Sequence, residues 1–527
     1  MSVHNRKKLV LATLVAASVI IPSVSFAAKP EPQQRVIIKF KDNLQNSGKA
    51  DLRRIGGVIK NNLKRHNAVA ANIPTAKLNS LMTNSNIEFI EDDAKRYPIT
   101  MTRSGPNAGS ITTNDHGPAE EVTPYGIQMV QADQVAGIVG PESKVCVIDS
   151  GYSLGHEDKP GLSVVTGTDD PGAGAWSEDG SGHGTHTSGT VNALANNDVG
   201  VVGVFPGSEM HIVRVFGNNG IWAYSSDLIH ALDDCMDNGA RVVSMSLGGS
   251  RPSVLENMAF RKAEKEGVFS IASAGNDGNN RMNYPASYHS VMSVAAVDDQ
   301  MKVANFSQKN THVEIAAPGV SVLSTVPVGS EMAVTLDDVN VIPMDGFDTP
   351  GAPITAALKD CGLGESASDC VGGAAGQICL IKRGGFSFAQ KALSCEAAGG
   401  VAAVIYNHSP GNLFGTLGAT QVSIPVVGTT LAHGESLVDG EVVTLSFTLT
   451  HWDYAYLSGT SMSAPHVAGV AALLFSHFPQ CSGTDIRNAI NATAMDLGTP
   501  GQDHAYGNGL VQAKAALDYL TLNGCAE

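Results

Sequence analysis

The chain has 527 residues, 43% of them hydrophobic and 16% charged, which excludes global disorder and a collagen-like architecture. At roughly 150 residues per domain, this length suggests about three or four folded units. The net charge of −16 is unevenly divided, because residues 1–111 hold 17 Lys and Arg against 7 Asp and Glu, whereas residues 112–527 hold 17 against 43. A body this acidic repels phosphate backbones and anionic lipid, so nucleic-acid and membrane partners are not expected.

The N-terminus has the layout of a secretory signal peptide. Basic residues at 6–8 precede an apolar run over 9–21, and the small-x-small sequence Ser25-Phe26-Ala27 follows. This pattern predicts cleavage after Ala27, so residues 1–27 are removed and the remaining chain is secreted. The apolar run is too short to cross a bilayer core of about 30 Å as a helix, which disfavours a membrane anchor.

All eight cysteines lie beyond the signal, and an exported chain can form disulfides. Cys379 and Cys395 bracket one unit and Cys481 and Cys525 another, so these are the expected pairs. Cys146 lies in an apolar strand, and we interpret it as a buried thiol. A metal site is disfavoured because the sequence has no C-x-x-C motif.

The chain after the signal begins with a small unit whose pattern is β-α-β-β-α-β, typical of a two-layer α+β domain. Its expected elements are a strand at 34–42, a basic amphipathic stretch at 49–65, a strand at 69–73, a helix at 75–83 and a strand at 87–91. Residues 103–123 are rich in Gly, Asn, Ser, Thr and Pro without periodicity, which predicts an exposed linker.

From residue 125 onward, apolar β-branched runs alternate with helical patterns. Fully apolar runs such as 144–148 indicate a parallel sheet covered by helices on both faces, with functional groups at the carboxyl ends of its strands. The expected strands are 143–148, 211–215, 241–246, 268–273 and 291–296, and the expected helices are 127–136, 183–195, 225–238, 253–266 and 461–477.

Residues 331–449 interrupt this pattern. They contain four of the eight cysteines, Gly-rich turns and short strands expected at 378–382, 401–406 and 422–428. We therefore predict a separate β-rich domain inserted into the α/β body, which resumes near residue 450.

Four short segments carry polar side chains suited to nucleophilic catalysis. Asp149 directly follows a buried strand, His183 opens a helix between glycines, and Asn276 follows the strand at 268–273. Ser461 lies at a helix N-terminus, where free N–H groups and the helix dipole favour an oxyanion. A lone Asp, His or Ser in such a position is more often a cap, turn or structural residue. Together, in the chain order Asp, His, Asn, Ser, they predict a Ser-His-Asp triad with an amide donor.

These motifs resemble those of the subtilisin-like serine proteases, or subtilases, over residues 112–330 and 450–527. The resemblance rests on Val145-Cys146-Val147-Ile148-Asp149-Ser150-Gly151, Gly182-His183-Gly184-Thr185-His186 and Ser458-Gly459-Thr460-Ser461-Met462-Ser463. It implies a three-layer sandwich and a monomeric serine endopeptidase acting on proteins and peptides. Asp149 would orient His183 as general base, Ser461 would be the nucleophile, and Asn276 and the Ser461 N–H would form the oxyanion hole. His186 is expected to be structural.

The resemblance also implies where substrate binds. A peptide would add as a strand along Ser246-Leu247-Gly248 and along the segment from Gly220 to Tyr224. The wall of the pocket for the residue before the scissile bond (P1) would be Ala272-Ser273-Ala274-Gly275, with Asn283 near its base. Because none of these residues is charged, a hydrophobic or broad P1 preference is expected.

Structural Ca²⁺ is the cofactor that the resemblance implies, and no redox or organic cofactor is expected. The ligands would be Glu121, Asp158, Leu194, Asn196, Val199 and Val201, an oxygen-rich set suited to a hard cation. The loop 194–201 is one residue longer than the family's, and an ion-free Asn-Asn-Asp turn is the alternative reading.

Residues 28–111 resemble an inhibitor I9-type propeptide with a ferredoxin-like fold, which would assist folding and then inhibit until it is cut. The inserted region resembles a protease-associated (PA) domain on Cys379-Leu380-Ile381-Lys382-Arg383-Gly384 and the segment 399–407. The PA domain would either gate and bind protein substrates or be a passive insert.

Two other classes of function fit the sequence less well than a protease does. A binding module on a silent scaffold is disfavoured because Asp149, His183, Asn276 and Ser461 are all present. A lipase or esterase would carry G-x-S-x-G, and the sequence from Gly459 to Ser463 lacks the second glycine.

Overall fold

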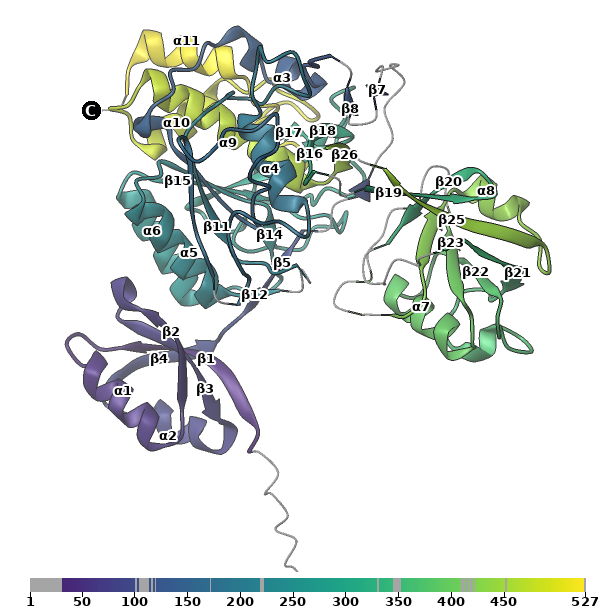
Figure 1. The fold of residues 1–527 in the computed structure, drawn as a ribbon. Coiled ribbons are helices and arrows are strands. Elements are labelled where there is room, and N and C mark those ends of the chain that lie inside the picture. Colours follow the sequence, from purple (N-terminus) through teal and green to yellow (C-terminus); the bar gives the residue numbers. More distant parts are fainter. Residues whose placement is uncertain are drawn as a thin grey trace, which may run out of the picture.

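The computed structural model describes three parts of the chain (Figure 1). They are the N-terminal domain (residues 31–99), the α/β body (120–328 and 453–525) and the inserted domain (331–450). Described residues run from 31 to 525 except 100–101, 104–112, 115–116, 119, 171, 219–221, 329–330, 345–351, 409–412, 414–416, 418–419, 421 and 451–452. The expected signal peptide lies outside them. Within the described residues, no helix has the length and hydropathy of a membrane span.

The body is built on a parallel sheet, as the apolar runs predict. Its seven strands are β9 (Val145–Asp149), β10 (Val165–Thr168), β11 (Met210–Arg214), β13 (Val242–Met245), β15 (Phe269–Ser273), β16 (Val291–Val297) and β17 (Val313–Pro318), in the order β10-β11-β9-β13-β15-β16-β17. Alternate side chains enter different cores: Val145 and Val147 face one, Cys146 and Ile148 the other. The sheet is therefore the middle layer of a sandwich.

Helices cover both faces of this sheet (Figure 1). One face carries α3 (Tyr125–Met129), α4 (His183–Asn192), α9 (Thr460–His477), α10 (Gly483–Ala492) and α11 (Ala513–Asn523), and the other carries α5 (Ser225–Asp237) and α6 (Val254–Lys265). The helix expected over 127–136 is shorter than predicted. It ends at Met129 because Gln131 adopts a left-handed conformation (φ 60°), and only a 3₁₀ turn at Ala132–Gln134 follows.

Helix α9 is the centre of the body. It is buried from Thr460 to Phe475, because its sequence is apolar or small on all sides. Pro465 within it has no N–H for the carbonyl of Ser461. The Ser246 hydroxyl donates to that carbonyl instead, at 2.8 Å, so α9 is tied to the segment after β13 at the point where Ser461 lies.

The N-terminal domain is an α+β unit with the predicted element order. Its elements are β1 (Gln33–Phe40), α1 (Gln45–Arg54), β2 (Val58–Leu63), β3 (Ala68–Pro74), α2 (Leu78–Met82) and β4 (Ile87–Asp92), and the antiparallel sheet has the order β2-β3-β1-β4. Val36 and Ile38 face the domain's own core. Ile37 and Ala70 instead join the core that α5 and α6 form, so the domain and the body share a hydrophobic interface.

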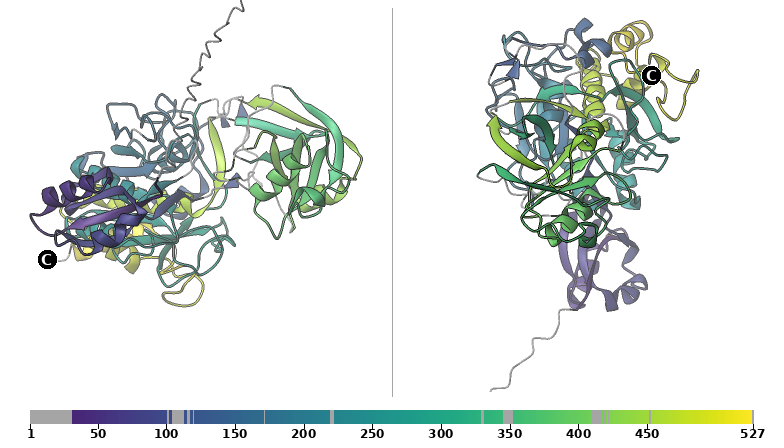
Figure 2. Two further views of the ribbon diagram at one scale, coloured as in Figure 1. Left: turned by 90° about the horizontal axis from the view of Figure 1, so that it is seen from below. Right: turned by 90° about the vertical axis from the view of Figure 1, so that its right-hand side faces the viewer.

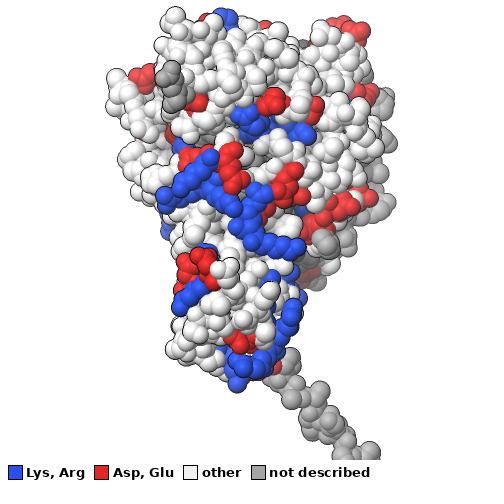
Figure 3. All heavy atoms as spheres, turned by 90° about the vertical axis from the view of Figure 1, so that its left-hand side faces the viewer, with Lys and Arg blue, Asp and Glu red and all other residues white. Residues whose placement is uncertain are grey.

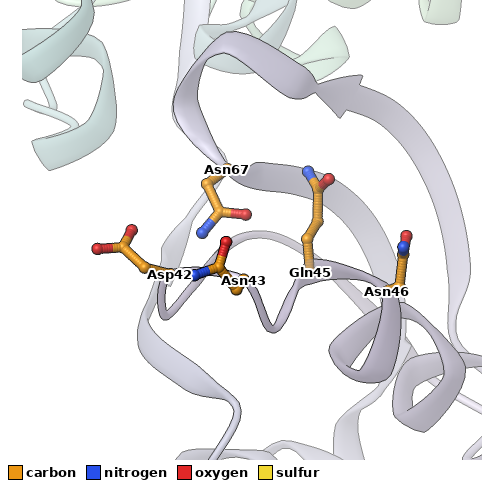
Figure 4. Close-up of a pocket in the computed structure, with 5 residues that line it drawn as sticks. All are labelled: Asp42, Asn43, Gln45, Asn46 and Asn67. Atoms are coloured by element: carbon orange, nitrogen blue, oxygen red, sulfur yellow. The ribbon is translucent and has the colours of Figure 1, made fainter.

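A polar hollow of about 610 Å³ lies on this domain, at the turn between β1 and α1 (Figure 4). Asn67 adopts a left-handed conformation there, and its amide donates to the carbonyls of Phe40 and Lys41 at 2.9 and 3.1 Å. The polar lining thus stabilises the turn. The hollow is lined by Asp42, Asn43, Gln45, Asn46 and Asn67.

The inserted domain is a closed barrel with the strand order β19-β20-β24-β23-β22-β21-β25. Its elements are β19 (Glu331–Leu336), β20 (Val339–Pro343), β21 (Ile354–Asp360), β22 (Ile378–Lys382), α7 (Phe388–Ala397), β23 (Ala402–Tyr406), β24 (Val426–Thr429), α8 (Leu431–Ser436) and β25 (Val442–Thr450). It is inserted between β18 (Val322–Thr325) and β26 (Tyr454–Ser458), which pair with each other antiparallel. The N-terminal and inserted domains lie on different sides of the body (Figure 2).

All eight cysteines are paired in the structure. The predicted pairs Cys379–Cys395 and Cys481–Cys525 are confirmed, and Cys361 bonds to Cys370. The interpretation of Cys146 as a free buried thiol is wrong, because it bonds to Cys235. Alternation along β9 turns Cys146 toward α5, which lies over that face of the sheet and carries Cys235 89 residues later.

The Cys146–Cys235 bond should stabilise the body, because it closes a loop of 89 residues in the unfolded chain. Replacing both cysteines by Ser should lower the free energy of unfolding of the body by about 4–5 kcal/mol on the chain-entropy account. Urea denaturation of a Ser461→Ala protein, followed by tryptophan fluorescence, measures this without self-digestion. Replacing Cys361 and Cys370 in the inserted domain is the control and should leave the transition of the body unchanged; equal losses would contradict the assignment.

Candidate active site

The carboxyl edge of the parallel sheet carries a carboxylate–imidazole pair. Asp149 is the last residue of β9, and its Oδ1 lies 2.7 Å from Nδ1 of His183, the first residue of α4. The same carboxylate accepts the N–H of Ser150 at 2.7 Å and the hydroxyl of Thr187 at 3.3 Å. Both members of the pair are almost fully buried, so Asp149 fixes the ring orientation of His183.

The backbone around His183 is arranged for this contact. Asp179 accepts hydrogen bonds from the N–H groups of Gly182 and Thr185, which holds the first turn of α4 in place. A Cβ atom on Gly184 would lie 2.3 Å from the carbonyl oxygen of Gly151, so only glycine permits this approach of α4 to β9.

The charge of Asp149 also sets the basicity of His183. Burial of the imidazole opposes protonation, but the charge of Asp149 and its hydrogen bond outweigh this, so the pKa of His183 lies above its ordinary value. Nε2, the other ring nitrogen, is buried and has no hydrogen-bond partner within the described part of the chain. This nitrogen is therefore available to take a proton.

Ser461 lies in the first turn of α9 and is fully buried. Its Oγ donates to the carbonyl oxygen of Ile99 at 3.2 Å and lies 3.5 Å from the carbonyl oxygen of Ser246. Asn276 is positioned beside it, because its amide oxygen accepts both the N–H and the hydroxyl of Thr460, at 2.9 and 2.8 Å. With the oxygen held this way, the NH₂ group is the donor end of the Asn276 amide.

A segment from the N-terminal part of the chain lies beside Ser461. Strand β5 (Lys95–Pro98) lies between β12 (Ala223–Tyr224) and β14 (Leu247–Gly248) and pairs antiparallel with both. The N–H of Ile99 then donates to the carbonyl oxygen of Ser246 at 3.2 Å. Beyond it, β6 (Thr102–Arg103) pairs with β26, which leads to Ser461. The described segments before and after residues 100–101 are therefore both extended and pair with the body on either side of Ser461.

The subtilase family model matches residues 140–340 and 398–509, more than half of the chain. The chain belongs to the subtilase family. The PA domain model matches residues 351–437, within the inserted barrel. The enzyme is accordingly a serine-type endopeptidase, and the expected family, fold class and inserted domain are confirmed.

Curated and solved relatives agree with this assignment. Subtilisin J of Geobacillus stearothermophilus is 31% identical over 343 residues, which cover 62% of this chain and 83% of that protein. Subtilisin DY of Bacillus licheniformis is 28% identical over 402 residues, 75% of this chain and 99% of that protein. The crystal structure of the psychrophilic subtilisin-like protease Apa1 from Pseudoalteromonas sp. AS-11 matches with a TM-score of 0.53 and 39% identity, over 76% of this chain and 99% of that one.

The subtilase substrate segments expected from the sequence are brought together at this cleft. Ala272 and Ser273 end β15, and the amide of Asn283 donates to the Ser273 carbonyl at 3.2 Å. A Cβ atom on Gly248 would lie 2.2 Å from the same amide, so Asn283 packs directly against strand β14. The N–H of Gly275 donates to the hydroxyl of Thr460 at 3.1 Å, which joins this wall to α9.

The expected calcium loop of this subtilase gathers oxygen atoms around Asn197. Its N–H donates to Glu121 at 3.1 Å, and its amide donates to Asp158 at 2.8 Å. Asp158 also accepts the N–H of Val201 at 2.7 Å. Burial, more than the nearby charge of Glu121, raises the pKa of Asp158 to about 7. The sequence names Asn196 as a ligand, and that assignment stays a prediction; the amide that contacts Asp158 in the structure is that of Asn197.

The remaining calcium-loop residues named from the sequence contribute backbone contacts. The N–H of Leu194 donates to the Asp158 carbonyl at 3.0 Å, and the N–H of Val199 donates to the Asn197 side chain at 3.3 Å.

His186, expected to be structural, is fully buried, and its Nε2 lies 3.1 Å from the carbonyl oxygens of Val322 and Ala455. Burial lowers the pKa of His186 to about 3, so it remains a neutral packing residue.

Sequence reasoning missed one charged pair at this cleft. Arg96 of β5 and Glu256 of α6 form an ion pair with both side chains 0% exposed. The only sequence signal is the Ser253-x-x-Glu256 pattern at the start of a predicted helix, which reads as a helix cap. Ser253 does cap α6 by accepting the N–H of Glu256 at 3.2 Å, but the carboxylate points to Arg96.

Asn276 should be needed in the transition state rather than for binding, if its NH₂ group donates to the developing oxyanion. Asn276→Ala should lower kcat by about 10²–10³-fold with little change in KM, measured on a small chromogenic peptide. Thr460→Val removes one of the two donors that orient the amide and should cause a smaller loss. A large rise in KM at unchanged kcat would contradict the oxyanion role.

Proposed function

We propose that this subtilase is a secreted endopeptidase made as a zymogen, and that its N-terminal domain is a propeptide removed by a first cut between Ile99 and Thr100. The observation that carries the proposal is the position of the Ile99 carbonyl oxygen, 3.2 Å from Oγ of Ser461. The pairing of β5 with β12 and β14 supports it, since this is how a substrate strand would lie on the acyl side of the scissile bond.

The proposed chemistry is acyl transfer. Oγ of Ser461 bonds to the Ile99 carbonyl carbon while its proton moves to Nε2 of His183, and Asp149 stabilises the imidazolium. The N–H of Ser461 and the amide of Asn276 hold the oxyanion. Collapse breaks the C–N bond, and His183 returns the proton to the leaving amine of Thr100. Water then hydrolyses the acyl-enzyme with His183 as base, which frees Ser461 and a carboxylate at Ile99.

Charge complementarity supports the role of the N-terminal domain as chaperone and inhibitor. Arg65 forms ion pairs with Asp233 at 3.5 Å, with Glu266 at 3.2 Å and with Asp237. Basic and acidic side chains gather where this domain meets the body (Figure 3). Arg65 therefore meets acidic residues of α5 and of the segment just after α6, so the domain should bind the body after the cut.

Two carboxylates of the N-terminal domain also support this role, because they cap helices of the body. Asp93 accepts the N–H and hydroxyl of Ser226 at 3.0 and 2.7 Å, at the start of α5. Glu91 accepts the N–H groups of Val254 and Leu255 at 2.7 and 2.9 Å, at the start of α6. Caps of this kind stabilise both helices while the body folds.

The substrates that we propose are proteins and peptides cut with a broad or hydrophobic P1 preference. The pocket wall of Ala272-Ser273-Ala274-Gly275 is uncharged, and Ile99 lies in the corresponding position of the bound segment.

The inserted domain is proposed to contact protein substrates on the leaving-group side, since it joins the body through β26, which pairs with Thr102 and Arg103. The working enzyme is proposed to be a monomer.

A structural calcium ion is proposed for the loop around Asn197. The carboxylates of Glu121 and Asp158, together with the Asn197 amide and loop carbonyls, form an oxygen-rich set that suits Ca²⁺. The ion would offset the repulsion between these acidic groups and tie the chain at Glu121 to the helix α4 that carries His183.

The proposed cut can be tested by N-terminal sequencing of the secreted protein. The wild type should yield a product beginning at Thr100, whereas Ser461→Ala should remain joined across Ile99–Thr100. Ser463→Ala, a neighbouring serine on the same helix, is the matched control and should process normally. A Thr100 N-terminus in the Ser461→Ala protein would show that another protease makes the cut.

The calcium proposal predicts that EDTA lowers the Tm of the Ser461→Ala protein and that added Ca²⁺ restores it. Asp158→Asn and Glu121→Gln should each reduce the Ca²⁺-dependent rise in Tm, because each removes a charged ligand. Asp198→Asn removes a charge from the same loop and is the control. Equal Tm values with and without EDTA would overturn the proposal.

A further inference from the structure

The side chain of Arg96, four residues before the proposed scissile bond, is enclosed in the α/β body. It is 0% exposed, and Glu256 accepts two hydrogen bonds from its guanidinium, at 2.9 and 2.5 Å. A third nitrogen of the guanidinium donates to the carbonyls of Lys95 and Arg251, at 2.9 and 3.1 Å. This fork-to-fork geometry is the one that distinguishes arginine from other side chains.

The side chains that hydrogen-bond to Glu256, apart from Arg96 itself, belong to the body. Glu256 is in the first turn of α6, and the Tyr288 hydroxyl donates to its carboxylate at 2.7 Å. The hydroxyl of Ser253 accepts the N–H of Glu256 at 3.2 Å. The wall beside Arg96 requires glycine, because a Cβ atom on Gly249 would lie 2.4 Å from the Lys95 carbonyl and 3.2 Å from the guanidinium. The carboxylate is thus preorganised for a cation.

Arg96 reaches this pocket because of its position in the extended segment that pairs with the body. The globular part of the N-terminal domain does not place it there. Arg96 lies on β5, opposite Ala223 of β12, in the strand that ends at Ile99. Any peptide that binds the cleft in the same register places its own fourth residue before the scissile bond against Glu256. An apolar residue there would leave a buried carboxylate without a cation, which is costly, whereas arginine restores the paired state.

We propose that Glu256 is a specificity-determining residue that selects arginine four residues before the scissile bond. This inference rests on the proposed function in one respect, that residues 95–99 lie in the cleft as a substrate does. The enzyme would then read two positions, an uncharged residue at the cut and a guanidinium three residues earlier. Lysine would be accepted less well, because an ammonium group cannot form both parallel hydrogen bonds.

The test uses the mature enzyme and four chromogenic peptides, X-Tyr-Pro-Ile-p-nitroanilide, where X is Arg, Lys, Leu or Ala. The wild type should cleave the Arg peptide with a kcat/KM at least about tenfold above that of the Leu peptide, with Lys between them. Glu256→Leu should remove or invert this ratio, and Glu256→Gln should reduce it. Glu264→Gln, which removes a charge from the other end of α6, is the control and should keep the wild-type ratio.

Equal kcat/KM values for the Arg and Leu peptides in the wild type would overturn the inference, as would a ratio that Glu256→Leu leaves unchanged. The wild-type comparison needs no variant, so a folding failure of Glu256→Leu does not leave the question open. The outcome is also separate from that of the proposed function. A product that does not begin at Thr100 contradicts the zymogen cut, whereas a correct Thr100 terminus with no Arg preference contradicts only the role of Glu256.

Discussion

The burial of α9 is the constraint on which the rest of the structure depends. Because the helix is enclosed from Thr460 to Phe475, its N-terminus has one position relative to the sheet. Ser246 secures that end: its hydroxyl satisfies the Ser461 carbonyl that Pro465 leaves without a helical donor, and its own carbonyl accepts the N–H of Ile99. One serine therefore couples the helix that carries Ser461 to the segment that ends at Ile99.

The N-terminal domain and the body form ion pairs across their interface. The ion pairs of Arg65 are partly exposed, so each stabilises the interface only weakly and salt screens it. The hydrophobic contact through Ile37 and Ala70 and the caps from Glu91 and Asp93 are less sensitive to salt. Salt should therefore slow the approach of a separated domain more than it weakens the domain once docked.

The sequence predicts strands, helix starts and site residues that depend on neighbouring residues. It does not predict contacts between residues that are far apart in the chain. The strands ending at Asp149 and Ser273 and the helices that begin near His183 and Ser461 follow from apolar runs and flanking glycines. The bond from Cys146 to Cys235 and the ion pair from Arg96 to Glu256 join residues 89 and 160 apart, and no short-range pattern marks them. The break at Gln131 escaped prediction because a non-glycine residue rarely adopts its left-handed conformation.

Under the proposed function, the segment 95–99 has two requirements to meet, since it would bind as a substrate and then stay as an inhibitor. A bidentate, fully buried ion pair serves the second requirement, because its dissociation exposes one charge and leaves the other without its partner. The same cost favours any incoming strand that brings a new guanidinium, so release of the domain is coupled to the arrival of a matching substrate. Glu256 would then link inhibition and selectivity through one carboxylate, and the residue at position 96 cannot change without altering both.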